Sequence, residues 1–134
     1  MTTIRFLAHR WPTWLALALA LATFADGLPP ASFLAALLVV MPLCYLAFGA
    51  VRGDLGERRT LAVQTAGLVA FGAWAATALL LDGGNALYVV AVGWFGHALW
   101  DFAHHRGGRV VPRAWSEWCG VVDASGAVAI FLMA

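Results

Sequence analysis

Five apolar segments, each of a length suited to crossing a membrane, follow one another along this chain. A helix needs about 20 mostly apolar residues to span the hydrocarbon core of a bilayer. The segments are continuous and rich in Ala and Leu, without the alternating pattern of a membrane β-strand. We therefore predict an all-α integral membrane bundle of five transmembrane helices that form a single domain. The predicted spans cover about residues 11–28, 31–51, 60–81, 86–105 and 114–134.

The composition excludes most other classes of protein. Of the 134 residues, 63% are hydrophobic and only 11% are charged. A soluble chain of this length buries about two thirds of its surface on folding, so the remaining apolar residues would form large exposed patches. The same composition excludes a disordered, collagen-like or disulfide-rich chain. A net charge of +1 also gives no basic surface for nucleic acid.

The basic residues predict the orientation in the membrane. All of them lie before the first segment, between the second and third, or between the fourth and fifth, whereas the other two breaks carry Asp26 and Asp82. The positive-inside rule then places the N-terminus in the cytoplasm and the C-terminus outside. We expect a multi-pass protein of the plasma membrane, the cell inner membrane. The basic residues are Arg5, Arg10, Arg52, Arg58, Arg59, Arg106, Arg109 and Arg113.

An alternative interpretation makes the first segment a cleaved signal peptide. Arg5 and Arg10 precede an apolar run over residues 15–22, and Thr23-Phe24-Ala25 would precede the cleavage point. Four spans would remain, with the same orientation.

Polar residues within the fourth segment point to a function. The pattern H-x3-D-x2-H-H brings His97, Asp101 and His104 into an arc of about 60° on a helix, with His105 about 40° beyond Asp101. A carboxylate in a membrane helix costs about 2.5–3.5 kcal/mol on insertion scales. Such a residue is expected to have a buried partner or a functional role.

The fifth segment offers a partner at the same depth. Asp123 and His97 both lie about 13 Å from the arginine-rich break, so we predict that they meet. Glu117 points about 120° away from Asp123, where it can pair with Arg113. Three further polar side chains project from the same half of the bundle: Cys44, Tyr45 and Gln64.

Imidazole and carboxylate groups at these spacings suit a divalent metal, Zn or Fe. The predicted ligands are His97, Asp101, His104 and His105, the last being either a fourth ligand or a substrate contact. Asp123 and Glu117 are the candidate catalytic groups, because a carboxylate beside a metal can accept a proton. With zinc the expected chemistry is hydrolysis, and with iron it is oxygenation.

The stretch Asp101-Phe102-Ala103-His104-His105, with His97 four residues before it, resembles a histidine box of membrane desaturases and hydroxylases. In that family H-x-x-H-H elements bind iron at the cytoplasmic edge of the membrane. Members of the family carry several boxes and more histidines than the four in this chain. The resemblance therefore implies a single-metal site, or one shared between subunits. Membrane hydrolases that bind zinc through His and Asp on several helices are similar in ingredients.

Other functions remain open at this point. A small proton- or ion-coupled transporter would also use intramembrane Asp and His, although it predicts polar residues in both leaflets. A haem-binding or structural subunit would use His97 or His104 as an axial ligand. A packing pair between His97 and Asp123, with His104 and His105 solvated at the membrane surface, would need no ligand. For the enzyme, the expected partners are a membrane lipid as substrate and a second copy of the chain.

Overall fold

The computed structural model describes residues 8–134, so the predicted role of Arg5 lies outside the described residues. The described part of the chain is helical and contains no strand, which confirms the all-α prediction. Its elements are α2 (Trp11–Phe24), α3 (Ala31–Val51), the 3-10 turn η1 (Asp54–Gly56), α4 (Arg58–Leu79), α5 (Gly84–Gly107) and α6 (Arg113–Met133).

Four of the helices are long and apolar enough to cross a membrane, which indicates a membrane protein. These helices, α3 to α6, contain 21 to 24 residues, and their bounds agree with the predicted spans to within a few residues. Helix α2 is apolar but has only 14 residues, fewer than the predicted span over residues 11–28. At 1.5 Å per residue it is about 21 Å long, shorter than a hydrocarbon core of about 30 Å. A fifth span is therefore not confirmed.

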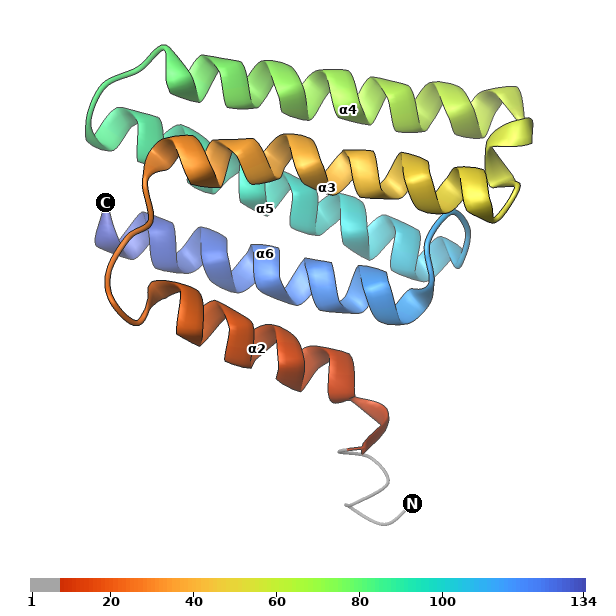
Figure 1. Cartoon of the computed structure of the whole chain (residues 1–134), viewed down its shortest axis with the longest axis horizontal. Coiled ribbons are helices and arrows are strands. Elements are labelled where there is room, and N and C mark those ends of the chain that lie inside the picture. The colour runs from red at the N-terminus through yellow and green to blue at the C-terminus, as the bar shows by residue number, and fades with distance from the viewer. Residues whose placement is uncertain (1–7) are drawn as a thin grey trace.

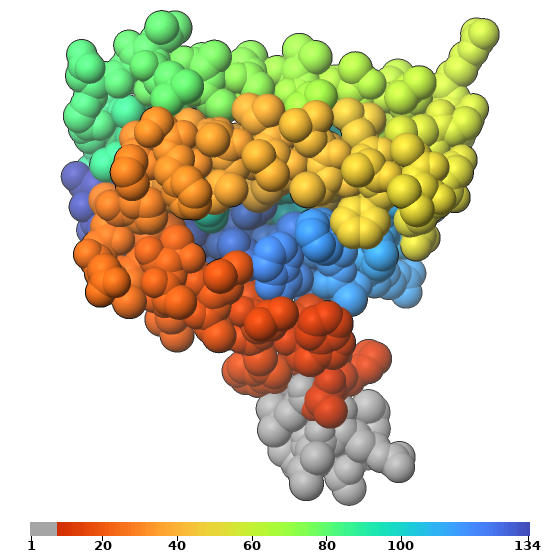
Figure 2. All heavy atoms as spheres, in the orientation of Figure 1, coloured from red at the N-terminus to blue at the C-terminus, as the bar shows by residue number. Residues whose placement is uncertain are grey.

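Successive helices run in opposite directions, so α2, α4 and α6 point one way and α3 and α5 the other (Figure 1). Helices α5 and α6 form the most extensive pair, α2 packs on α6, and α3 packs against α4 and α5. Atoms of α6 are visible between α3 and α2 on the face shown in Figure 2. The connections over residues 52–57 and 108–112 lie at one end of the bundle, here called the arginine end (Figure 1). The other two connections and the C-terminus lie at the opposite end.

Helix ends follow local sequence signals. Pro12 stands in the first turn of α2, where a missing N–H costs nothing, and Pro30 and Pro112 precede α3 and α6. Helix α5 ends at Gly108, which has a φ of 66° and whose N–H bonds the carbonyl of His104. Such a left-handed residue closes a helix at little cost only when it is glycine.

The two connections at the arginine end are joined to each other. Arg109 donates a hydrogen bond to Glu57 at 2.7 Å, and the N–H of Val110 donates to Asp54 at 2.8 Å. Val110 has a φ of 72°, which is costly for a β-branched residue, but it is held there by this bond and by burial of its side chain. The link fixes the ends of α3 and α5 relative to each other.

Close packing of α5, α6 and α3 depends on a glycine facing a tryptophan. A Cβ added at Gly126 of α6 would lie 2.5 Å from Cζ3 of Trp94, which projects from α5. The Trp94 indole donates a hydrogen bond to the carbonyl of Leu34 in α3 at 3.0 Å. One buried side chain therefore sets the spacing of three helices.

Both the surface and most of the interior of the bundle are apolar. Large apolar side chains such as Leu21, Val69 and Leu132 are exposed on the outside of the bundle. The buried polar or charged side chains are Gln64, His97, Asp101, Ser116 and Asp123. An apolar surface around a partly polar interior suits a lipid environment.

Candidate metal centre

Three ionisable side chains meet in the interior of the bundle. His97 and Asp101 project from α5 and Asp123 projects from α6, and each side chain is 0% exposed. His97 Nδ1 lies 2.7 Å from Asp123 Oδ2 and 3.2 Å from Asp101 Oδ2. The predicted contact between His97 and Asp123 is therefore present. One potential ligand atom from each residue lies within 4.8 Å of the others, so the three residues, here called the buried His/Asp group, can hold a metal ion.

The local sequence explains how these side chains come together. His97 and Asp101 are four residues apart, which places them one above the other on the same face of α5. Gly120 of α6 lies opposite them, and a Cβ at that position would be 3.2 Å from Asp101 Cβ. Because glycine has no side chain, the α6 backbone passes close to α5. Asp123, one turn further along α6, then reaches His97.

Tyr45 of α3 completes the group. Its hydroxyl donates a hydrogen bond to Asp101 Oδ1. Its ring meets the His97 ring edge-on, with centroids 5.7 Å apart. The sequence predicted that Tyr45 projects from this half of its helix but assigned it no partner. The signal that identifies it is its depth. Tyr45 lies six residues before the last residue of α3, and Asp101 lies six residues before the last residue of α5.

Two atoms of the group have no hydrogen-bond partner among the described residues. They are His97 Nε2 and Asp123 Oδ1, and both are buried. A buried polar atom without a partner costs about 1–3 kcal/mol, so an occupant that binds either atom would be stabilised. Imidazole nitrogen and carboxylate oxygen are both ligands that zinc and iron accept.

The structure does not bring His104 into the group. Its Nδ1 donates to the carbonyl of Trp100 at 2.9 Å, which leaves Nε2 to accept a hydrogen bond from the Gln64 amide of α4 at 2.8 Å. The lone pair that would bind a metal therefore faces α4. His104 touches the group only through Tyr45, whose ring centroid lies 4.8 Å from its own.

His105 and Glu117 lie elsewhere, near the arginine end. His105 Nδ1 donates to the carbonyl of Arg113 at 3.1 Å. Glu117 accepts a hydrogen bond from Thr13 at 2.6 Å and one from Arg10 at 3.3 Å. The pair expected between Glu117 and Arg113 is replaced by these contacts, because α2 packs against α6 and brings Arg10 to the carboxylate.

Comparison with protein-family models, with characterised proteins and with solved structures finds no match for this chain. Any assignment of function to this protein therefore rests on the geometry of its own residues.

Proposed function

We propose that this protein is a small membrane-embedded metal-dependent enzyme whose divalent ion is held by His97, Asp101 and Asp123. The observation that carries the proposal is the meeting of one imidazole and two carboxylates, all fully buried, on two neighbouring helices. Within residues 8–134 no arginine forms an ion pair with either carboxylate.

Charge balance supports a cation in the group. Two ionised carboxylates beside one imidazole are negative even if the imidazole is protonated, and such a charge is costly in a low-dielectric interior. A divalent ion with a neutral imidazole makes the group neutral. Protonation of both the imidazole and one carboxylate does the same without a metal, so the two states are separated by metal analysis.

A bound ion would supply activation of water for hydrolysis if it is zinc, or of dioxygen for oxygenation if it is iron. Of the two carboxyl groups predicted to accept a proton, Asp123 contacts His97 and Glu117 does not. We therefore assign the exchange of protons to Asp123, which would bind the ion through one carboxylate oxygen and accept the proton at the other. Asp101 is held by Tyr45 and His97 and serves as a ligand.

The proposal includes a place in the cell. The arginine end faces the cytoplasm by the positive-inside rule, which puts the C-terminus outside and the buried His/Asp group in the inner leaflet of the plasma membrane. Helix α2 lies in the bilayer as a fifth, shorter span, since it packs on α6 and exposes apolar side chains such as Leu17 and Leu21. A substrate that reaches this group from the membrane is a lipid or another apolar molecule.

The experiment is elemental analysis of the detergent-purified protein, prepared without a metal-binding tag. We expect Zn or Fe in a fixed ratio to the chain. Asp101→Asn and Asp123→Asn keep the side-chain shape and should abolish metal retention. The control is Asp82→Asn, which removes the same charge from an exposed connection. Unchanged metal content in both site variants, with the helices intact by circular dichroism, would reject the assignment.

A further inference from the structure

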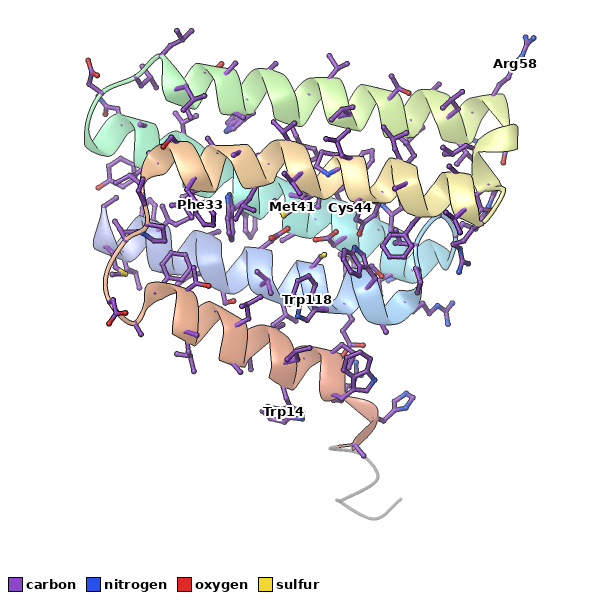
Figure 3. All side chains as sticks on the ribbon, viewed as in Figure 1. Trp14, Phe33, Met41, Cys44, Arg58 and Trp118 are labelled. Carbon is purple, nitrogen blue, oxygen red and sulfur yellow. The ribbon has the colours of Figure 1, made fainter. Side chains whose placement is uncertain are left out.

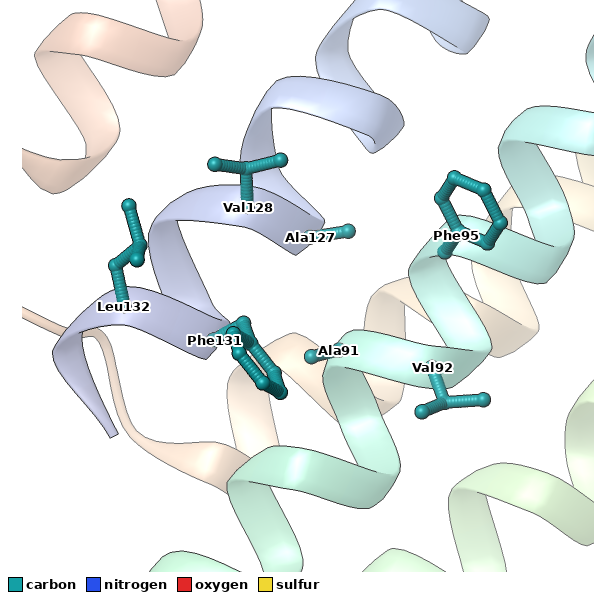
Figure 4. A pocket seen from close by; sticks show the side chains of 7 residues that line it. All are labelled: Ala91, Val92, Phe95, Ala127, Val128, Phe131 and Leu132. Carbon is teal, nitrogen blue, oxygen red and sulfur yellow. The ribbon is translucent and has the colours of Figure 1, made fainter.

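A groove runs along the outer surface of the α5/α6 pair. Near the arginine end it is a cavity of about 500 Å³ between α2, α5 and α6. Farther along the same two helices lies a second cavity of about 290 Å³, which has a wholly apolar lining (Figure 4). Phe95 lines both cavities, which therefore adjoin along the two helices, and together they are here called the α5/α6 groove.

The floor of the groove is made of small residues and its walls of large apolar ones. Ala91 and Ala127 lie between Phe95 and Phe131 in Figure 4, and Ala98 continues this floor toward the arginine end. From Ala91 to His105 the groove follows α5 for about 21 Å at 1.5 Å per residue. A groove of this length and polarity fits one hydrocarbon chain lying along the helix pair.

Polar and charged groups occur only at the arginine end of the groove. Thr13 and Ser116 supply hydroxyl groups there, beside His105. Arg10 lines the same end, and the Arg106 guanidinium lies 5.8 Å from the ring centroid of Phe102, another lining residue. The one acidic lining residue, Glu117, is already paired with Arg10. The positive charges therefore exceed the negative ones where the hydrocarbon part ends.

From this distribution of charge we propose that the α5/α6 groove binds an anionic phospholipid, with one acyl chain along Phe95 and the phosphate at Arg10 and Arg106. Arginine suits phosphate because its planar fork offers several donors. The groove deepens the proposed function by naming a substrate class, and that part rests on the metal centre. Gly120 and Ala98 line the groove, and a Cβ on Gly120 would lie 3.2 Å from Asp101 Cβ. At Gly120 the groove therefore passes close to Asp101 of the buried His/Asp group.

Lipid binding is tested in nanodiscs that contain equal amounts of phosphatidylglycerol and phosphatidylcholine, with the lipids that remain bound counted by native mass spectrometry. We expect phosphatidylglycerol to be retained over phosphatidylcholine. Arg10→Gln should reduce that preference about fivefold, the effect of about 1 kcal/mol for one basic residue near the membrane surface. The matched control is Arg58→Gln, which removes the same charge at the same end but from a side chain that extends away from the bundle (Figure 3). Equal retention of the two lipids, or an equal effect of both variants, would overturn the proposal.

A second pair of variants tests the groove itself. Ala124→Trp places a large side chain in the lining and should abolish retention, whereas Ala66→Trp on the exposed face of α4 should leave it unchanged. Displacement of the lipid by glycerol phosphate alone would show that the groove binds a free phosphate and would overturn the proposal. A dimer that is present in the wild-type protein and lost in Ala124→Trp would also overturn the proposal, because the groove would then bind a second copy of the chain.

Failure of this proposal can be told apart from failure of the metal centre. Asp123→Asn should lose its metal and keep the bound lipid, because Asp123 does not line the groove. Lipid retained by a wild-type protein that holds no metal would support the groove and reject the proposed function.

Discussion

Substitution of Gly126 by alanine tests the packing that holds the site together. The added Cβ would lie 2.5 Å from Cζ3 and 2.6 Å from Cε3 of Trp94. A favourable contact between carbon atoms needs about 3.5–4.0 Å, so the indole would have to move by about 1 Å. Trp94 is 2% exposed and bonds Leu34, so it cannot move without losing that bond. We expect overpacking to cost about 1–3 kcal/mol, with about 1 kcal/mol more if the hydrogen bond breaks.

Gly72→Ala is the matched control, because a Cβ at Gly72 of α4 meets nothing within 4 Å. Alanine is favoured over glycine in a helix by about 1 kcal/mol, and this term is common to both variants. The difference between them in free energy of unfolding therefore isolates the clash. It can be measured by reversible unfolding in sodium dodecyl sulfate, followed by circular dichroism. Equal stability of the two variants would refute the close approach of α5 and α6.

Three further predictions concern the surroundings of the metal centre and the arginine end. Tyr45→Phe removes the hydrogen bond to Asp101 and should weaken metal affinity about 10–100-fold, as loss of a group that orients a metal ligand usually does. Helix content should not change. Unchanged affinity in a metal titration would contradict this role of Tyr45. Gln64→Leu should reduce the free energy of unfolding by about 0.6 kcal/mol, the average for a hydrogen bond between membrane helices. It should leave the metal content unchanged, because His104 lies outside the buried His/Asp group. Loss of metal in this variant would indicate that His104 is a ligand. The hydrogen bond from Arg109 holds the pKa of Glu57 below its ordinary value. This contact therefore stabilises the fold above pH 4.5, and the stabilisation is lost as the pH falls through the lowered pKa. Arg109→Gln should raise the pKa of Glu57 in a carboxyl NMR titration, and an unchanged pKa would show that the pair does not form.

The sequence predicts the helices well because their signals are local. Apolar runs bounded by Pro, Gly and Arg define α3 to α6 to within a few residues. Helix α2 ends at Phe24 rather than near residue 28, because the segment over residues 25–30 forms the turn that leads into α3. The residues that end the helix, Asp26 and Gly27, lie inside the span predicted over residues 11–28, because an apolar count over a window does not locate the helix end.

The site was predictable in part. The contact between His97 and Asp123 follows from counting residues inward from one connection, since α5 ends and α6 begins at that connection. The position of His104 on the same arc of the helix as His97 and Asp101 suggested a ligand. It could not show that the two ring nitrogens of His104 bond a backbone carbonyl and the Gln64 amide. The partner of Tyr45 depends on how α3 packs against α5. Contacts of this kind are set by tertiary packing, which no spacing within one helix reveals.

The pairing of Glu117 illustrates the same limit. Spacing on α6 predicted Arg113 as its partner, one turn away. The observed partners, Arg10 and Thr13, lie more than 100 residues away in sequence. They reach Glu117 only because α2 packs on α6. The charge on Glu117 is therefore satisfied between helices and not within one.

X-ray absorption at the edge of the bound metal tests the central claim most directly. For a zinc-loaded protein we expect nitrogen and oxygen neighbours at about 2.0–2.2 Å, with the scattering of a single imidazole that disappears in His97→Ala and persists in His104→Ala. Sulfur at about 2.3 Å would instead place the ion on Cys44 or Cys119. That spectrum, or the absence of any bound metal, would contradict a centre built from His97, Asp101 and Asp123.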